Sequence, residues 1–125
     1  MTDKMAELKF IDKKKRIKVF LNHAKLELAR YKRTKRNIHL SQASEKIWAG
    51  FVLLIELKSG KEIKTHKGIE MESYNLIKKN KLNRELSDNA SLLHSYYYEG
   101  RIFSDTVVRK IIKSLRLFNK ELKKV

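Results

Sequence analysis

Residues 41–57 read SQASEKIWAGFVLLIEL, and this stretch decides the fold. From Ile47 onward, apolar side chains fall on nearly every side of a helix drawn through it. A helix that is apolar all round normally lies at the centre of a domain. The polar residues Gln42, Glu45 and Lys46 then come at the entrance to that centre, where buried polar groups need partners. We therefore predict a central helix whose first turns lie beside a polar, ligand-binding opening.

Residues 92–101, LLHSYYYEGR, form a second apolar-rich segment that ends in polar groups. On a helix, His94 shares one stripe with Tyr97 and Tyr98, one turn away, and with Arg101, two turns away. An imidazole beside a phenol and a guanidinium can bind a phosphate or exchange a proton near neutral pH. The alternative is a buried structural histidine that forms a hydrogen bond with Gln42 or Glu45 and helps to fix helix register. Because Gln42 and His94 both interrupt otherwise apolar helices, we predict that they lie in one hydrogen-bond network where these two helices meet.

Periodicity predicts five helices and an all-α fold. The expected spans are about 5–36, 41–59, 65–79, 82–99 and 104–122. The inward stripes are Ile17, Phe20, Leu21, Ala24, Leu28 and Tyr31 in the first, Leu86, Ala90, Leu93 and Tyr97 in the fourth, and Val107, Val108, Ile111, Ile112, Leu115, Phe118 and Leu122 in the fifth. Asn37 is expected to stop the first helix, and Ser41 and Thr65 to cap the second and third. Short connections favour an up-down-up-down four-helix bundle with one additional flanking helix. We expect one domain over residues 1–125, with a core at about 14–122.

The net charge of +16 is unevenly placed. Residues 1–39 hold 13 basic and 4 acidic groups, a balance of +9, and residues 106–125 have a balance of +6. By contrast, residues 40–57 have a balance of −1 and residues 86–105 a balance of −2. The excess is typical of a face that binds RNA or DNA. A solvated surface that keeps the protein in solution is the simpler interpretation.

Several classes of site are not indicated. The chain has no Cys, so disulfides and thiolate metal sites are excluded. It shows no Gly-rich phosphate loop and no His-x-x-x-His pair, so we predict neither a metal nor a cofactor. No apolar run reaches the ~18 residues that span a bilayer, and no signal peptide is evident, so we expect a cytoplasmic protein that does not enter the membrane. His66 follows the expected cap at Thr65, where the amides at a helix N-terminus favour an anion. The alternative is that His66 is only a structural residue of the capping turn.

Two stretches resemble the archaeal PaREP family. Residues 42–49, QASEKIWA, are similar to its Q-A-(A/S)-E-K-x-W-G-A motif, and residues 93–99, LHSYYYE, to its L-H-x-x-F-Y-E motif. The resemblance covers about 17–122 and includes a histidine near the start of the third helix. Ala49-Gly50 stands where the family has Gly-Ala, and Tyr97 where it has Phe.

This family is similar to the HEPN superfamily of helical bundles, so the resemblance implies a HEPN-like fold. Some HEPN proteins are metal-independent ribonucleases, and others are nucleotide-binding partners in toxin–antitoxin and defence systems. Their ribonucleases use Arg, four to six residues, then His, at a dimer interface. Arg16 with His23 and Arg33 with His39 fit that spacing, against about 0.8 expected by chance. Both matches lie in or beside the first helix, whereas the superfamily's motif belongs to a later one.

Three functions are therefore open. The leading prediction is a non-catalytic nucleotide- or nucleic-acid-binding module. The second is a metal-independent ribonuclease, with His94 as general acid or base and Arg101 stabilising phosphate charge. The third is a structural adaptor without a ligand. A homodimer is expected because small domains with apolar surface on their terminal helices often bury it against a second copy. The ligand-binding candidates are Gln42, Glu45, Lys46, His66 and Tyr98.

Overall fold

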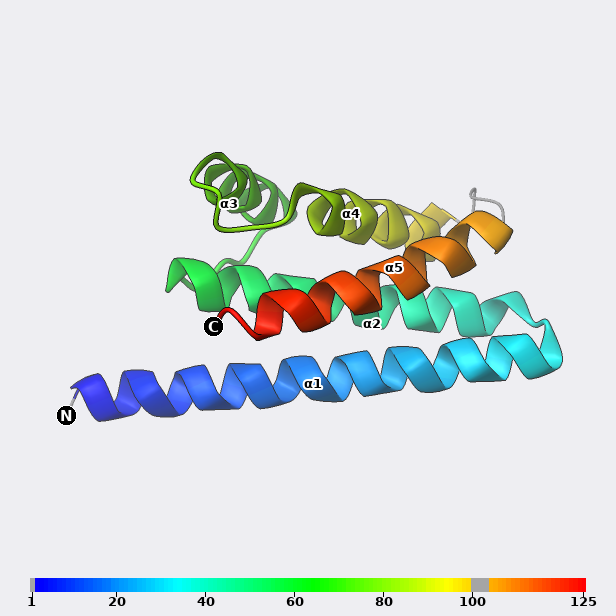
Figure 1. Ribbon diagram of the computed structural model, residues 1–125, viewed down its shortest axis with the longest axis horizontal. Helices are drawn as coiled ribbons and strands as arrows, with labels where there is room; N and C mark the ends of the chain where they lie inside the picture. Colours follow the sequence, from blue (N-terminus) through cyan, green and yellow to red (C-terminus); the bar gives the residue numbers. More distant parts are fainter. Residues whose placement is uncertain (1, 100–103) are drawn as a thin grey trace.

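The computed structural model describes residues 2–99 and 104–125, and all regular secondary structure within them is helical (Figure 1). The helices are α1 (Thr2–Thr34), α2 (Asn37–Ser59), α3 (His66–Lys78), α4 (Arg84–Glu99) and α5 (Ser104–Leu122). The predicted all-α class is confirmed. In Figure 1, α1, α2, α4 and α5 run in alternating directions, and α3 is turned out of their common direction.

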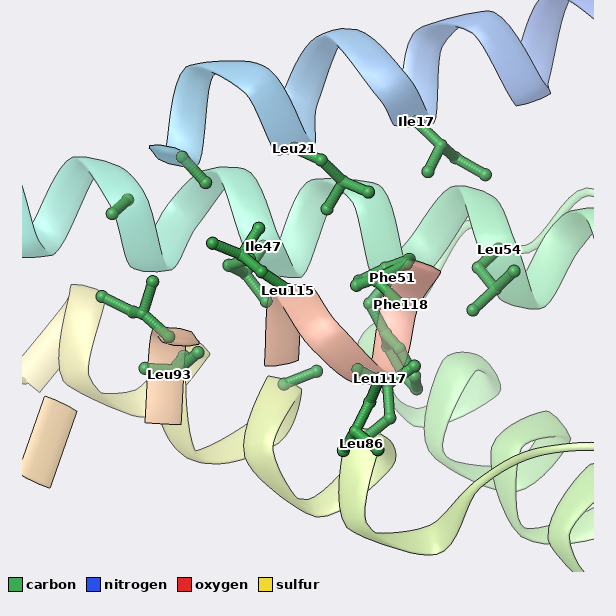
Figure 2. Close-up of a cluster of buried hydrophobic side chains, with 14 of the residues drawn as sticks. Ile17, Leu21, Ile47, Phe51, Leu54, Leu86, Leu93, Leu115, Leu117 and Phe118 are labelled. Atoms are coloured by element: carbon green, nitrogen blue, oxygen red, sulfur yellow. The ribbon is translucent and has the colours of Figure 1, made fainter. Parts of the chain in front are cut away.

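The helix predicted to be central, α2, contacts each of the other four helices. Its neighbours present apolar stripes to it on several sides, as Figure 2 shows. The fully or almost fully buried side chains there include Ile17 and Leu21 of α1, Ile47, Phe51 and Leu54 of α2, Leu86 and Leu93 of α4, and Leu115, Leu117 and Phe118 of α5. Each such aliphatic or aromatic side chain contributes about 1.5–3 kcal/mol when it leaves water. The apolar surface of α2 therefore holds the bundle together.

The prediction that Ser41 caps the second helix is wrong, because α2 already begins at Asn37. Arg36 takes the N-cap position and makes no side-chain capping bond. The chain reverses between α1 and α2 within two residues, and Lys35 adopts a left-handed conformation with φ 59°. Asn37 consequently starts α2 and does not stop α1.

Other predicted helix ends are close to those observed. Gly60, with φ 71°, ends α2, as a left-handed C-terminal glycine commonly does. The Thr65 hydroxyl caps α3 by accepting from the Gly68 N–H at 3.0 Å. The fourth helix starts at Arg84, two residues later than predicted, because the side chain of Asn83 caps it.

Two predicted inward positions are corrected. Tyr96 is buried in α4, whereas Tyr97 is only half-buried. Burial raises the pKa of the Tyr96 phenol above its ordinary value, and the hydrogen bond with Ser41 of α2 offsets only part of that rise. In α5, Ile112 is 38% exposed because it lies 100° round the helix from the buried Ile111.

A buried carboxylate joins three chain segments at the end of the bundle. Glu121 of α5 is 2% exposed, and its Oε1 accepts from the Asn83 N–H at 3.0 Å. Its Oε2 lies 2.8 Å from Nζ of Lys58 in α2, whose side chain is 8% exposed. The same Nζ donates to the Lys81 carbonyl oxygen at 2.9 Å. Glu121 therefore connects the last turns of α2 and α5 to the α3–α4 connection.

We predict that Glu121→Ala lowers the free energy of unfolding by about 3–5 kcal/mol, because it leaves the buried Lys58 ammonium without its counter-ion. Glu121→Gln keeps an acceptor for the Asn83 N–H and should cost less. Glu85, whose pair with Lys113 is exposed, is the control, and Glu85→Ala should change stability by less than about 1 kcal/mol. Urea unfolding followed by circular dichroism measures all three. Equal losses for Glu121→Ala and Glu85→Ala would contradict the structural role of Glu121.

Candidate functional site

Three rings from three helices stack together at one side of α2. The centroids of Trp48 in α2 and His94 in α4 are 4.3 Å apart, with an angle of 19° between the ring planes. The His66 ring, at the start of α3, lies 5.0 Å from His94 and 5.1 Å from Trp48. The structure thus brings together two histidines that are 28 positions apart in the sequence and were both predicted as site residues.

The first turn of α3 fixes the position of His66. The hydroxyl of the preceding Thr65 caps that turn at the Gly68 N–H. A Cβ at Gly68 would come within 2.7 Å of Cγ2 of Ile63 and 3.0 Å of Oγ1 of Thr65. Glycine at this position therefore allows the capping turn to fold tightly and holds the imidazole against the stack.

The two imidazoles have different surroundings. His94 is half-buried, and burial lowers the pKa of its imidazole, with a smaller contribution in the same direction from His66. His66 is more exposed, and its Nδ1 lies 3.5 Å from Oε1 of Glu70. His94 consequently favours the neutral form, which can accept a proton.

The predicted pocket residue Lys46 of α2 points away from this stack, toward α1. Nζ of Lys46 lies 5.7 Å from the ring centroid of Phe20 in α1, and it pairs with Glu45 at 3.2 Å. Gln42 precedes Lys46 by one turn and shares its side of the helix. In the part of the chain that the structure describes, no hydrogen bond joins Gln42 to His94. Lys46 therefore faces α1, while Trp48 faces α3 and α4.

Arg101 lies outside the described residues, and so does the side chain of Tyr98. Two histidines belong to the Arg–His spacings found in the sequence. Nδ1 of the first, His39, lies 2.8 Å from Oε2 of Glu27 in α1. Burial raises the pKa of the Glu27 carboxyl, but the hydrogen bonds with His39 and Arg30 together lower it by more. The pKa of Glu27 is therefore below its ordinary value. The other histidine, His23, is exposed on α1. The Glu27–His39 contact joins the end of α1 to the start of α2.

A cavity of about 250 Å³ adjoins Trp48 and Phe51 between α3 and α4. Its charged side chains have both signs, with Glu70 and Asp88 against Arg84, and its other polar groups are mainly hydroxyls. This balance gives the cavity no preference for an anion. It can provide a small polar ligand with access to the ring stack.

A larger groove, of about 590 Å³, lies between α1 and α5 and is basic. Its lining consists of Lys14, Lys18, Leu21, Asn22 and Lys25 of α1 with Asn119, Leu122, Lys123 and Val125 at the end of the chain. Four lysines and two amides thus surround an apolar floor, and no carboxylate side chain lines the groove. Within the described residues, Lys18, Lys25 and Lys123 have no carboxylate within 4.0 Å. Nζ of Lys14 donates to the Val125 carbonyl oxygen at 3.1 Å, so the groove offers the ammonium groups of Lys18, Lys25 and Lys123 to an anionic ligand.

The sequence located this charge on the first and last segments but did not show that the two segments face each other. The available signal was the position of the lysines: Lys14, Lys18 and Lys25 flank the buried stripe of Ile17 and Leu21. Residues that border a buried stripe line the edge of the contact with the next helix. Only the pairing of α1 with α5 turns this edge into a groove.

Two kinds of feature are absent from the described residues. None of the helices there is long and apolar enough to cross a membrane. Residues 2–99 and 104–125 also contain no group of three His, Asp or Glu side chains arranged to hold a metal ion.

Comparisons with family models, curated proteins and solved structures give no match to this chain.

We predict that acidification destabilises the fold through His94. The pKa of the folded His94 is below the unfolded value of about 6.5, so the unfolded state binds the proton first as the pH falls. Stability that is complete at pH 7.5 should decline toward pH 5, by at most about 1.4 kcal/mol per pH unit for one proton. His94→Phe retains a stacking ring and should flatten this decline.

Urea unfolding at a series of pH values tests this dependence, with His23→Phe as the exposed control. His66 lies against His94, and Glu70 lies beside His66; both remain in every variant. The lowered pKa of Glu27 keeps its titration below this pH window. A slope that is the same in wild type and His94→Phe would show that His94 does not carry the effect.

Proposed function

We propose that this protein is a non-catalytic nucleic-acid-binding module that holds a phosphate backbone in the α1–α5 groove. The observation that carries the proposal is the four-lysine lining without a carboxylate side chain. Phosphates that replace condensed counterions on such a surface gain free energy from counterion release. The net charge of +16 also attracts a polyanion from a distance. Base-specific recognition is not part of the proposal, because the groove has no aromatic side chain on which bases could stack.

We also propose that the bundle is HEPN-like and related to the PaREP family, and that it acts in the cytoplasm as a homodimer. The alternating directions of α1, α2, α4 and α5 support the first point (Figure 1). Exposed apolar residues on α1 support the dimer: Met5, Leu8, Phe10, Ile11, Val19 and Leu26. Sedimentation equilibrium measures the subunit number directly.

We predict that the double variant Lys18→Gln, Lys25→Gln binds nucleic acid about tenfold more weakly than wild type. Because it loses two phosphate contacts, the slope of log affinity against log salt concentration should become smaller in magnitude by about 1–2. The loss should be similar for oligonucleotides of different sequence. Fluorescence anisotropy with labelled RNA and DNA at about 50 and 200 mM salt measures affinity and slope.

The matched control for the groove is Lys64→Gln with Lys67→Gln, which removes the same charge from exposed lysines around the start of α3. It should reduce affinity much less than the groove variant. If both pairs reduce affinity equally, the effect comes from net charge and the groove has no special role. If wild type does not bind at low salt, the adaptor interpretation replaces this proposal.

A second candidate function, metal-independent RNA cleavage, is favoured by the His66–His94 stack. Two imidazoles 5.0 Å apart can provide a general base and a general acid, and the lowered pKa of His94 suits the base. The adjoining cavity reaches the Trp48 ring of this stack.

If this activity exists, it should persist in chelator, and His94→Ala should reduce it about 100-fold or more with little change in RNA affinity. His23→Ala and His39→Ala are the controls, because the Arg–His spacings place these residues in the competing site. Cleavage that is lost in a control variant and kept in His94→Ala would move the site to α1 for His23 or to the start of α2 for His39. An inactive, carefully purified wild type leaves binding as the function.

A further inference from the structure

A second basic cavity lies on the other flank of α5, against α4. It has a volume of about 340 Å³ and is lined by Arg109, Lys110, Lys113 and Arg116 of α5 with Glu85 and Asn89 of α4. Four cations therefore face one carboxylate. The groove proposed for nucleic acid lies on the α1 side of α5, so the two surfaces are distinct.

The cations of this cavity are available to a ligand. Arg109 pairs with Asp105 at 3.6 Å and Lys113 with Glu85 at 3.9 Å, but all four side chains are exposed, and such pairs contribute little. Within the described residues, Lys110 and Arg116 have no carboxylate within 4.0 Å. The cavity thus carries an uncompensated positive charge that favours an anion, and a dianion over a monoanion.

Asn89 provides a second, independent indication of a ligand. This residue is 2% exposed, and its Nδ2 has no hydrogen-bond acceptor within the described part of the chain. A buried N–H group without an acceptor costs about 1–3 kcal/mol, and folded proteins leave few of them. Asn89 lines the basic cavity, and a small rotation of its buried amide would bring Nδ2 to an anionic oxygen bound there.

The cavity also has an apolar side. Ile112, which the sequence predicted to be inward, is 38% exposed and belongs to the lining. Small-ligand sites commonly combine an apolar surface with a few polar groups that fix orientation. The body of a ligand can pack on Ile112 while its anionic end meets the cations.

We propose that the α4–α5 cavity binds a phosphate monoester. A monoester carries a charge of about −1.5 to −2 near pH 7, in contrast to −1 for the diester of a nucleic-acid backbone. Its oxygens accept from the guanidinium of Arg116, the ammonium of Lys110 and the Asn89 amide. The source of the monoester is either a small phosphorylated molecule or the 5′-phosphate at the end of a nucleic-acid chain.

Phenyl phosphate is the probe for the small-molecule source, with phenol and diethyl phosphate as comparison ligands. Calorimetry at low salt should show binding of phenyl phosphate, at least tenfold weaker binding of diethyl phosphate and no binding of phenol. Arg116→Gln should weaken phenyl phosphate binding about tenfold, whereas Lys120→Gln, a turn away on α5 and outside the lining, should not. Asn89→Asp, which replaces the donor with an anion, should abolish binding, and circular dichroism confirms that each variant is folded.

Matched RNAs with a 5′-phosphate or a 5′-hydroxyl test the chain-end source. If the phosphorylated RNA binds more tightly than the hydroxyl RNA, and Arg116→Gln removes this difference, the site binds a chain end. If phenyl phosphate binds but the two RNAs bind equally, the site binds a small molecule. The Lys18→Gln with Lys25→Gln variant should leave phenyl phosphate binding unchanged, so failure of the groove proposal and failure of this one are distinguishable. The proposal is overturned if neither probe binds through its phosphate, or if Arg116→Gln and Lys120→Gln have equal effects.

Discussion

The burial of α2 on several sides is the constraint on which the rest of the structure depends. A helix with apolar residues all round loses stability wherever it meets water, so each of the other helices must cover part of it. This requirement sets the inward stripes of α1, α4 and α5 (Figure 2). Near the two ends of α2, polar residues find partners on neighbouring segments, where His39 pairs with Glu27 and Lys58 pairs with Glu121.

Covering α2 also determines where the charge can lie. The helices α1 and α5 direct their apolar stripes toward the core, so their many lysines and arginines fall on the flanks and outer faces. On one flank α5 meets α1, and the lysines of both helices line a common groove. On its other flank α5 meets α4, where Asn89 lies behind a row of α5 cations. One amphipathic helix thus contributes to two basic surfaces of different shape and chemistry.

The sequence predicts these helices well, because a stripe at helical spacing depends only on order along the chain. It predicts contacts between helices less well. His66 and His94 were both candidates and do meet, yet Lys46 lies against Phe20 of α1. Trp48 and Lys46 are two positions, or about 200°, apart on one helix, so they must face different neighbours. Tyr96 replaces Tyr97 in the core for a related reason: both positions satisfy the spacing, and only the rotation of α4 against α2 distinguishes them.

The placement of Glu121 connects this architecture with the proposed binding of anions. Residues 106–125 contain seven basic residues and one acidic residue, Glu121, which is buried against Lys58 and Asn83 and does not line either basic surface. The exposed pairs Arg109–Asp105 and Lys113–Glu85 offset little of the charge on the outer turns of α5, so like-charge repulsion among the cations there opposes the compact state. Anions that bind the folded form relieve this repulsion and stabilise it by mass action. The buried Glu121 carboxylate stabilises the end of the bundle against this repulsion. The cations on the two basic surfaces therefore remain available to the proposed anionic ligands.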